Sequence, residues 1–156
     1  MTPSERMHEL GISLPPTPAP AGSYVPGTRV GNLVMTSGQI PLSGGKLAAK
    51  GKVGQAIGLE EAVAAARLCG LNALAVAADI AGGIDRIERI VRLGVFVSSA
   101  PGFNDQPKVA NGASDLMIQI FGDAGRHVRA AVGSNELPLD AAVEVELTAE
   151  IRVDGQ

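Results

Sequence analysis

The end of the chain alternates apolar and polar residues. In residues 143–153 valine, leucine and isoleucine alternate with charged or hydroxyl side chains, the period of a strand with one buried face. Residues 127–132 predict a second strand, and residues 135–138 predict the turn between the two. If this turn closes a hairpin, antiparallel pairing sets Arg129 opposite Glu144, which lies on the polar face.

Two longer apolar patterns predict helices. In residues 55–81 apolar positions follow helical spacing and extend around most of the axis, so this helix must be largely covered. In residues 104–121 they recur at intervals of three and four, and Gly122 supplies a stop. Between these helices the β-branched segment 87–97 predicts a strand.

The beginning of the chain predicts shorter elements. Residues 2–10 predict a short helix, with a threonine as N-cap and a proline at the first helical position. A proline-rich arm follows through Pro20, and its prolines exclude regular strand pairing. Segments 25–30 and 33–40 predict two strands joined by a Gly-Asn turn.

This order of elements predicts an α+β fold. Two helices can cover only one face of a sheet, so we expect two layers, with a mostly antiparallel or mixed sheet packed on two helices. We expect residues 1–22 to form the N-terminal helix and arm, and residues 23–156 to form the domain proper. The second sheet face needs a cover, and self-association is the simplest one for a small domain.

Composition excludes several classes of protein. The chain has 156 residues, 46% of them hydrophobic, with no tryptophan and one tyrosine, which fits one domain with an aliphatic core. A net charge of −3 without a basic stripe argues against a nucleic-acid partner. No leader and no uninterrupted membrane span is predicted, so we expect a cytoplasmic protein without a membrane partner.

Metal and nucleotide sites are not indicated. Cys69 is the single cysteine and lies in a helical, alanine-rich run, so we expect it in the core. His8 and His127 lack acidic or cysteine neighbours at ligand spacing, which predicts no metal. The stretch 44–47 contains Gly-Gly-Lys but has leucine where a P-loop needs serine or threonine, so no nucleotide is expected.

Arg129 and Glu144 are the first candidates for a functional site. The simpler explanation is an ion pair on a solvated face, and the two residues by themselves favour it. A planar guanidinium beside a carboxylate can also hold a substrate carboxylate by two parallel hydrogen bonds while the glutamate handles a proton.

Five motifs occur in order between about Ser23 and Val153. They are Gly-x-Tyr-x-x-Gly at 22–27, Gly-Asn-x-x-x-Thr-Ser-Gly-Gln-Ile-Pro at 31–41, Val-Phe-Val at 95–97, an arginine at 129, and Leu-Pro-x-Asp-x-x-x-Glu-x-Glu at 137–146. Together they resemble the RidA/YjgF family of enamine and imine deaminases. The resemblance implies a chorismate-mutase-like α+β fold, assembled as a homotrimer whose sheets form a barrel, with active sites in clefts between subunits.

The resemblance also implies a reaction and a set of residues. Family members hydrolyse 2-aminoacrylate-type enamines and their imine tautomers to 2-keto acids and ammonia, without a cofactor. By position the substrate-carboxylate arginine is Arg129 and the water-positioning glutamate is Glu144. The substrate-binding positions fall on Tyr24, Gly38, Asn111 and Ala131.

Alternatives remain for each of these positions. Tyr24 could serve only in packing, Asn111 could be an ordinary exposed polar residue, and Gly38 could permit a strand-end bulge. Ala131 replaces a cysteine often found in the family, and together with the N-terminal arm it indicates a divergent branch with a different pocket wall. A non-catalytic trimer that binds carboxylates is the second hypothesis, whereas the acidic pI and the single tyrosine argue against the third, an endoribonuclease.

Overall fold

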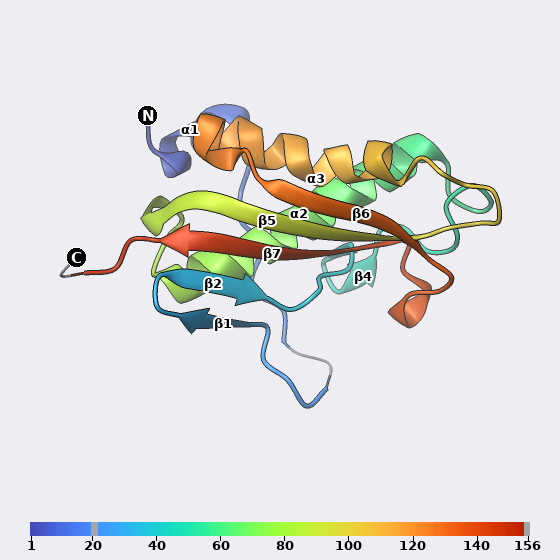
Figure 1. Cartoon of the computed structure of the whole chain (residues 1–156), viewed down its shortest axis with the longest axis horizontal. Coiled ribbons are helices and arrows are strands. Elements are labelled where there is room, and N and C mark those ends of the chain that lie inside the picture. The colour runs from blue at the N-terminus through green and yellow to red at the C-terminus, as the bar shows by residue number, and fades with distance from the viewer. Residues whose placement is uncertain (20–21, 155–156) are drawn as a thin grey trace.

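The computed structural model describes residues 1–19 and 22–154 (Figure 1). Its helices are α1 (Pro3–Leu10), α2 (Leu59–Ala81) and α3 (Gln106–Phe121), with short 3-10 turns at Ile84–Arg86, Gly122–Gly125 and Pro138–Asp140. Its strands are β1 (Gly27–Val30), β2 (Leu33–Thr36), β3 (Leu42–Ser43), β4 (Lys46–Leu47), β5 (Ile87–Ser98), β6 (Val128–Ser134) and β7 (Val143–Ile151). Residues 20–21 of the predicted arm and residues 155–156 of the predicted domain lie outside the described residues.

The main sheet has five strands in the order β1-β2-β7-β5-β6 (Figure 1). Only β5 and β6 run parallel, and the other neighbouring pairs are antiparallel. The helices α2 and α3 pack on one face and bury the apolar face of β5 and β7. The predicted α+β fold, with a mixed sheet on two helices, is confirmed.

The predicted hairpin between residues 127–132 and 142–147 is wrong. β6 pairs in parallel with one edge of β5, and β7 pairs antiparallel with its other edge. Arg129 therefore lies beside Leu93 and Glu144 beside Phe96, so the predicted opposition of Arg129 and Glu144 is also wrong. The residues between β6 and β7 carry the chain past the end of β5 instead of closing a tight turn.

Small residues let the two long helices approach closely. A Cβ at Gly112 of α3 would lie 2.0 Å from the carbonyl oxygen of Val63 in α2, and a Cβ at Gly70 would lie 3.1 Å from Ala113 Cβ. The helix α2 is long and apolar enough to cross a membrane by length and composition, but 61% of that stretch is buried inside the fold. This is the environment of a core helix, and Cys69 is fully buried there, as predicted.

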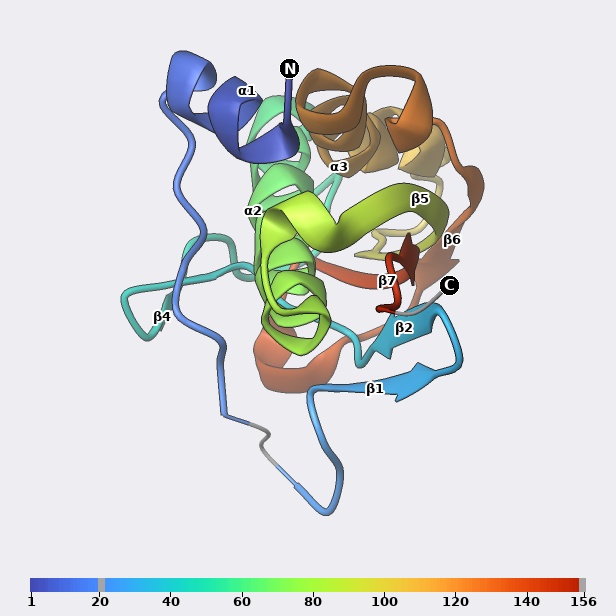
Figure 2. The same ribbon diagram turned by 90° about the vertical axis from the view of Figure 1, so that its left-hand side faces the viewer.

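The N-terminal helix forms as predicted. Thr2 caps α1 through a capping box with Glu5, and Gly11 ends the helix in the left-handed conformation. Met7 joins the core, and Ser4 donates hydrogen bonds from its backbone and hydroxyl to Asp85. The arm after α1 then runs along the outer side of α2 toward β1 (Figure 2).

No helix within residues 1–19 and 22–154 covers the other face of the sheet (Figure 2). The side chains of Val128 and Val132 on β6 point to this open face, beside Arg92 and Phe96 of β5, and are 67% and 46% exposed. Met35 on β2 lies on the same face and is 39% exposed. Such apolar side chains on one sheet face are typical of a surface that packs against another chain.

Candidate functional site

Three of the predicted residues, Tyr24, Gly38 and Glu144, line one pocket of about 260 Å3. It opens where β2 ends, beside the turn that precedes β7. Most of its wall is apolar. The lining residues are Pro18, Ala19, Tyr24, Pro26, Gly38, Gln39, Ile40, Leu42, Pro138, Leu139 and Glu144.

A one-residue irregularity places Gly38 against Glu144. Met35 pairs with Thr148, and Gln39 bridges to Val145, so four residue steps on one strand face three on the other, as in a β-bulge. The bulge anticipated at Gly38 is therefore present, but the glycine has a second role. A Cβ at Gly38 would lie 2.7 Å from Glu144 Cδ and 2.9 Å from its Oε1. Only glycine lets the carboxylate lie against the backbone here.

The environment of Glu144 disfavours its charged form. Burial, and secondarily the negative charge of Glu146 on the same face, raise the pKa of the Glu144 carboxyl above its ordinary value. Glu146 itself is paired with Arg92 at 3.0 Å. A carboxyl with a raised pKa is a stronger proton acceptor once it is ionised, which suits a general base.

Arg129 lies elsewhere, held by the helix α3. Its Nη1 donates to Asn111 Oδ1 at 2.8 Å and to Ser114 Oγ at 3.1 Å. Both hydrogen bonds use the same nitrogen. The other two nitrogens of the Arg129 guanidinium, Nη2 and Nε, have no hydrogen-bond partner among the described residues. Asn111 is thus brought together with Arg129 as predicted for one site, but its role here is to orient the guanidinium.

Ser114 and His127 extend this arrangement and were missed from the sequence. The carbonyl of Gly125 can only accept, so His127 Nδ1 donates to it at 2.7 Å, and in the neutral ring Nε2 then accepts from Ser114 Oγ at 2.9 Å. The Ser114 hydroxyl is thereby oriented to accept from Arg129. The signal in the sequence was the position of Ser114, one helical turn after Asn111.

The two groups lie on opposite faces of the sheet. Arg129 is in register with Leu93 and Glu144 with Phe96, and these two positions of β5 are three residues apart, so they point to opposite faces. The strands β6 and β7 are also separated by β5, which puts their backbones roughly 10 Å apart. One small ligand cannot contact Arg129 and Glu144 of the same chain at once.

Ala131 belongs to neither group. Its side chain packs partly buried against the core, on the helix-covered face of β6. The pocket wall is instead supported by Asn72 of α2, which is 4% exposed and donates to the carbonyl oxygens of Ile40 and Leu42 at 3.1 Å. Asn72 is a buried polar residue inside an apolar helix, which is the sequence signal that could have identified it.

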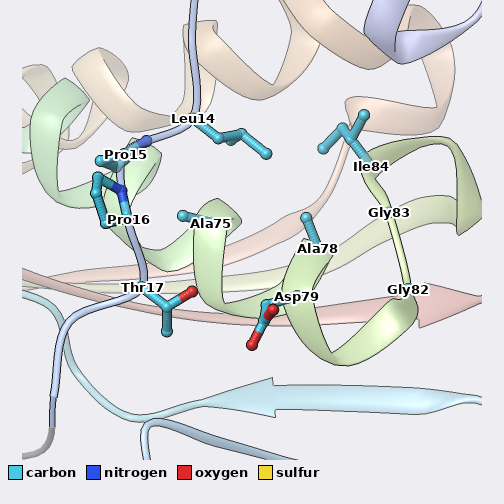
Figure 3. A pocket seen from close by; sticks show the side chains of 10 residues that line it. All are labelled: Leu14, Pro15, Pro16, Thr17, Ala75, Ala78, Asp79, Gly82, Gly83 and Ile84. Atoms are coloured by element: carbon cyan, nitrogen blue, oxygen red, sulfur yellow. The ribbon is translucent and has the colours of Figure 1, made fainter.

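A larger groove lies away from these residues. It has a volume of about 610 Å3 and separates the N-terminal arm from the end of α2 (Figure 3). Among its described lining residues Asp79 is the only ionisable one, and none of the predicted site residues is among them. We therefore place the candidate chemistry at the smaller pocket, where a carboxyl with a raised pKa meets an apolar wall.

No cluster of three or more potential metal ligands occurs within residues 1–19 and 22–154. The thiol of Cys69 donates to the carbonyl oxygen of Val143 at 3.4 Å inside the core. Burial, with a smaller contribution from Glu144, raises the pKa of this thiol. Among the predicted site residues, the ionisable groups considered for chemistry are the carboxyl of Glu144 and the guanidinium of Arg129.

Comparison with known proteins identifies relatives that match almost the whole chain. A family model described as YjgF/chorismate mutase-like, putative endoribonuclease matches residues 4–151. Protein TCP17 from Trypanosoma cruzi is 42% identical over 146 residues, which cover 93% of this chain and 91% of that protein.

Solved structures agree with this match. A putative endoribonuclease from Shewanella oneidensis superposes with a TM-score of 0.93 at 39% identity, over 97% of this chain and 100% of that chain. E. coli TdcF, crystallised with bound serine, superposes with a TM-score of 0.65 at 27% identity, over 88% of this chain and 94% of that chain.

Proposed function

This chain belongs to the YjgF/chorismate mutase-like family, and on that premise we propose that it hydrolyses 2-imino acids and their enamine tautomers to 2-keto acids and ammonia. The proposed sites lie in clefts between the subunits of a homotrimer. Each cleft joins Arg129 of one subunit to Glu144 of the next. No cofactor takes part in this proposal.

The observation that carries the proposal is the separation of two complementary half-sites. One half holds a guanidinium with free donors, and the other holds a carboxyl with a raised pKa in an apolar pocket. Since they lie on opposite faces of one sheet, a second copy is needed to complete the site. The exposed apolar residues of the open sheet face, which include Val128 and Val132, support such an assembly.

The proposed chemistry follows from these two groups. Arg129 holds the substrate carboxylate by parallel hydrogen bonds and so fixes the C=N carbon. Glu144 accepts a proton from a water that adds to this carbon, and returns it to the nitrogen of the tetrahedral intermediate. Collapse of that intermediate releases ammonia and leaves the 2-keto acid, so one water is consumed for each C=N bond cleaved.

The modest demands of the reaction suit this simple site. An imine carbon is already electrophilic, so positioning of the water and the substrate supplies most of what is needed. E. coli TdcF binds serine, a small molecule with a carboxylate on its α-carbon. A ligand of this kind fits the role proposed for Arg129.

The test is ammonia or keto-acid release from imino acids generated in situ by an amino-acid oxidase. The wild type should accelerate their decay, and Arg129→Ala should lower kcat/KM about 10²-fold, because the carboxylate loses a charge-assisted pair of hydrogen bonds. The matched control is Arg6→Ala, which removes a half-exposed arginine on α1 that does not line the pocket around Arg129. Ligand stabilisation without turnover would favour a carboxylate-binding trimer instead, and salt-dependent RNA cleavage would favour an endoribonuclease.

A further inference from the structure

Leu139 is an apolar side chain in an unfavourable position. It is 68% exposed, and its backbone has a φ of 59°, as does that of Asp140. Residues other than glycine, asparagine and aspartate rarely adopt this left-handed conformation. An exposed leucine held in a strained turn points to a functional role for its side chain.

The turn that carries Leu139 is tethered to a neighbouring loop. The backbone nitrogen of Gly51 donates to the carbonyl oxygen of Asp140 at 2.8 Å, and that of Ala142 donates to Ala49 at 3.3 Å. The ammonium of Lys52 also donates to the carbonyl oxygen of Asn135. These bonds hold Leu139 at the edge of the pocket that contains Glu144.

The N-terminal arm contributes to the same pocket. Pro18 and Ala19 line it together with Leu139, although they lie more than a hundred residues earlier in the chain. Among the described lining residues the ionisable ones are Tyr24 and Glu144, and no cationic side chain is present. A substrate that projects a second carboxylate into this pocket would meet Glu144 without a compensating cation.

We propose that this pocket, walled by the arm and by Leu139, selects imino acids with bulky apolar side chains over small or acidic ones. The inference rests on the proposed imine hydrolysis and names its substrate class. With the substrate carboxylate on Arg129 of a neighbouring subunit and the C=N carbon beside Glu144, the side chain extends toward Leu139 and Pro18.

The dimensions and lining of the pocket support this choice. An engineered apolar cavity of about 150 Å3 in another protein is large enough to bind benzene, and this pocket has about 260 Å3. A hydrophobic pocket discriminates by roughly 10-fold to 200-fold for each methylene group that fills it. Imines derived from leucine or phenylalanine should therefore be hydrolysed with a higher kcat/KM than the imine derived from alanine.

The test compares kcat/KM for imines generated from leucine, alanine and glutamate. The wild type should prefer the leucine-derived imine at least about tenfold over the alanine-derived one. Leu139→Asn should reduce this ratio about tenfold, and asparagine tolerates the left-handed backbone, so the turn is preserved. Leu139→Lys should raise the ratio of the glutamate-derived to the leucine-derived rate. Leu10→Asn, on an exposed helix far from the pocket, is the control and should change neither ratio.

Three kinetic or assembly outcomes, and one binding outcome, would overturn the inference. One is equal wild-type rates across the panel, and another is an unchanged ratio in Leu139→Asn. The third is dissociation of the oligomer by Leu139→Asn with unchanged selectivity, since Leu139 would then be an interface residue.

Calorimetric binding of 4-methyl-2-oxopentanoate and pyruvate separates this inference from the proposed function. Absence of turnover on every imine sinks the hydrolase, whereas equal affinities for the two keto acids sink the pocket assignment alone.

Discussion

Gly38 and Glu144 touch where β2 rejoins β7 across a bulge. Motif order alone identified both residues, as well as Tyr24 and Arg129. The distances between their side chains could not be predicted, because a bulge and a register shift depend on pairing between strands far apart in sequence. Ser114 and His127 were missed for a related reason, since their hydrogen bonds form only once α3 packs beside β6.

Replacing Gly38 by alanine should separate catalysis from stability. The new Cβ displaces the carboxylate of Glu144, and a misplacement of about 1 Å can reduce kcat about 10²-fold. The melting temperature should change little, because the φ of Gly38 is not in the left-handed region and the side chain of Glu144 can move. Steady-state kinetics and thermal unfolding check this, with Gly58→Ala as the control. Unchanged kcat in Gly38→Ala would contradict the role of Glu144.

The ionised carboxylate of Glu144 should also lower the free energy of unfolding at neutral pH. Its folded pKa is raised, so the folded state binds this proton more tightly than the unfolded chain does. Stability is therefore lost as the pH rises from the unfolded pKa of about 4.3 through the folded pKa. Glu144→Gln should melt at a higher temperature than the wild type at pH 7 and at a similar one near pH 4. A lower melting temperature for the variant at pH 7 would exclude the raised pKa.

At the scale of elements, the presence of helices and strands was easier to predict than the pairing of the strands in the sheet. The three α-helices, the five strands of the main sheet and the stop at Gly122 follow from periodicity and caps, although the strand predicted over residues 33–40 ends at Thr36 and the short strands β3 and β4 were not predicted. The hairpin prediction for residues 127–147 failed because it used only the local turn. The signal that was overlooked is the order strand, helix, strand in β5, α3 and β6, which favours a parallel pair.

The packing of α3 on α2 gives a test at this scale. At Gly112 a new Cβ would meet the backbone of Val63, which cannot move aside as a side chain can. Gly112→Ala should therefore destabilise the fold by about 3 kcal/mol and displace the helix that orients Arg129. Denaturant unfolding measures the loss, with the exposed Asp115→Ala on the same helix as control. A destabilisation no larger than that of the control would contradict the close packing.

At the scale of the whole molecule, our proposal makes assembly through the open sheet face a condition for a complete site. The prediction that this face needs a cover came from counting layers, and the structure leaves Val128 and Val132 exposed there. Periodicity could not identify what covers this face, because the apolar pattern of one chain shows that a face is buried but not which molecule buries it. A homotrimer remains our proposal for that cover.

A charge on this face should dissociate the assembly. Val132→Glu places a carboxylate in an apolar contact, where burial of an unpaired charge is strongly unfavourable. Light scattering should give the mass of a monomer for the variant and of a trimer for the wild type, and the hydrolase activity should fall with the mass. Leu10→Glu, on an exposed helix, is the control. Full activity in a monomeric Val132→Glu would refute a site shared between subunits.

Subunit mixing tests the central claim most directly. Arg129→Ala and Glu144→Gln should each be inactive alone, but their mixed trimers contain clefts in which the intact Arg129 of one chain meets the intact Glu144 of the other. After exchange of subunits, imine hydrolysis should recover to about a quarter of the wild-type rate, since one random pairing in four restores both halves. Recovery of this size would establish a hydrolase whose site is built from two chains. No recovery from fully exchanged, well-folded trimers would contradict the account.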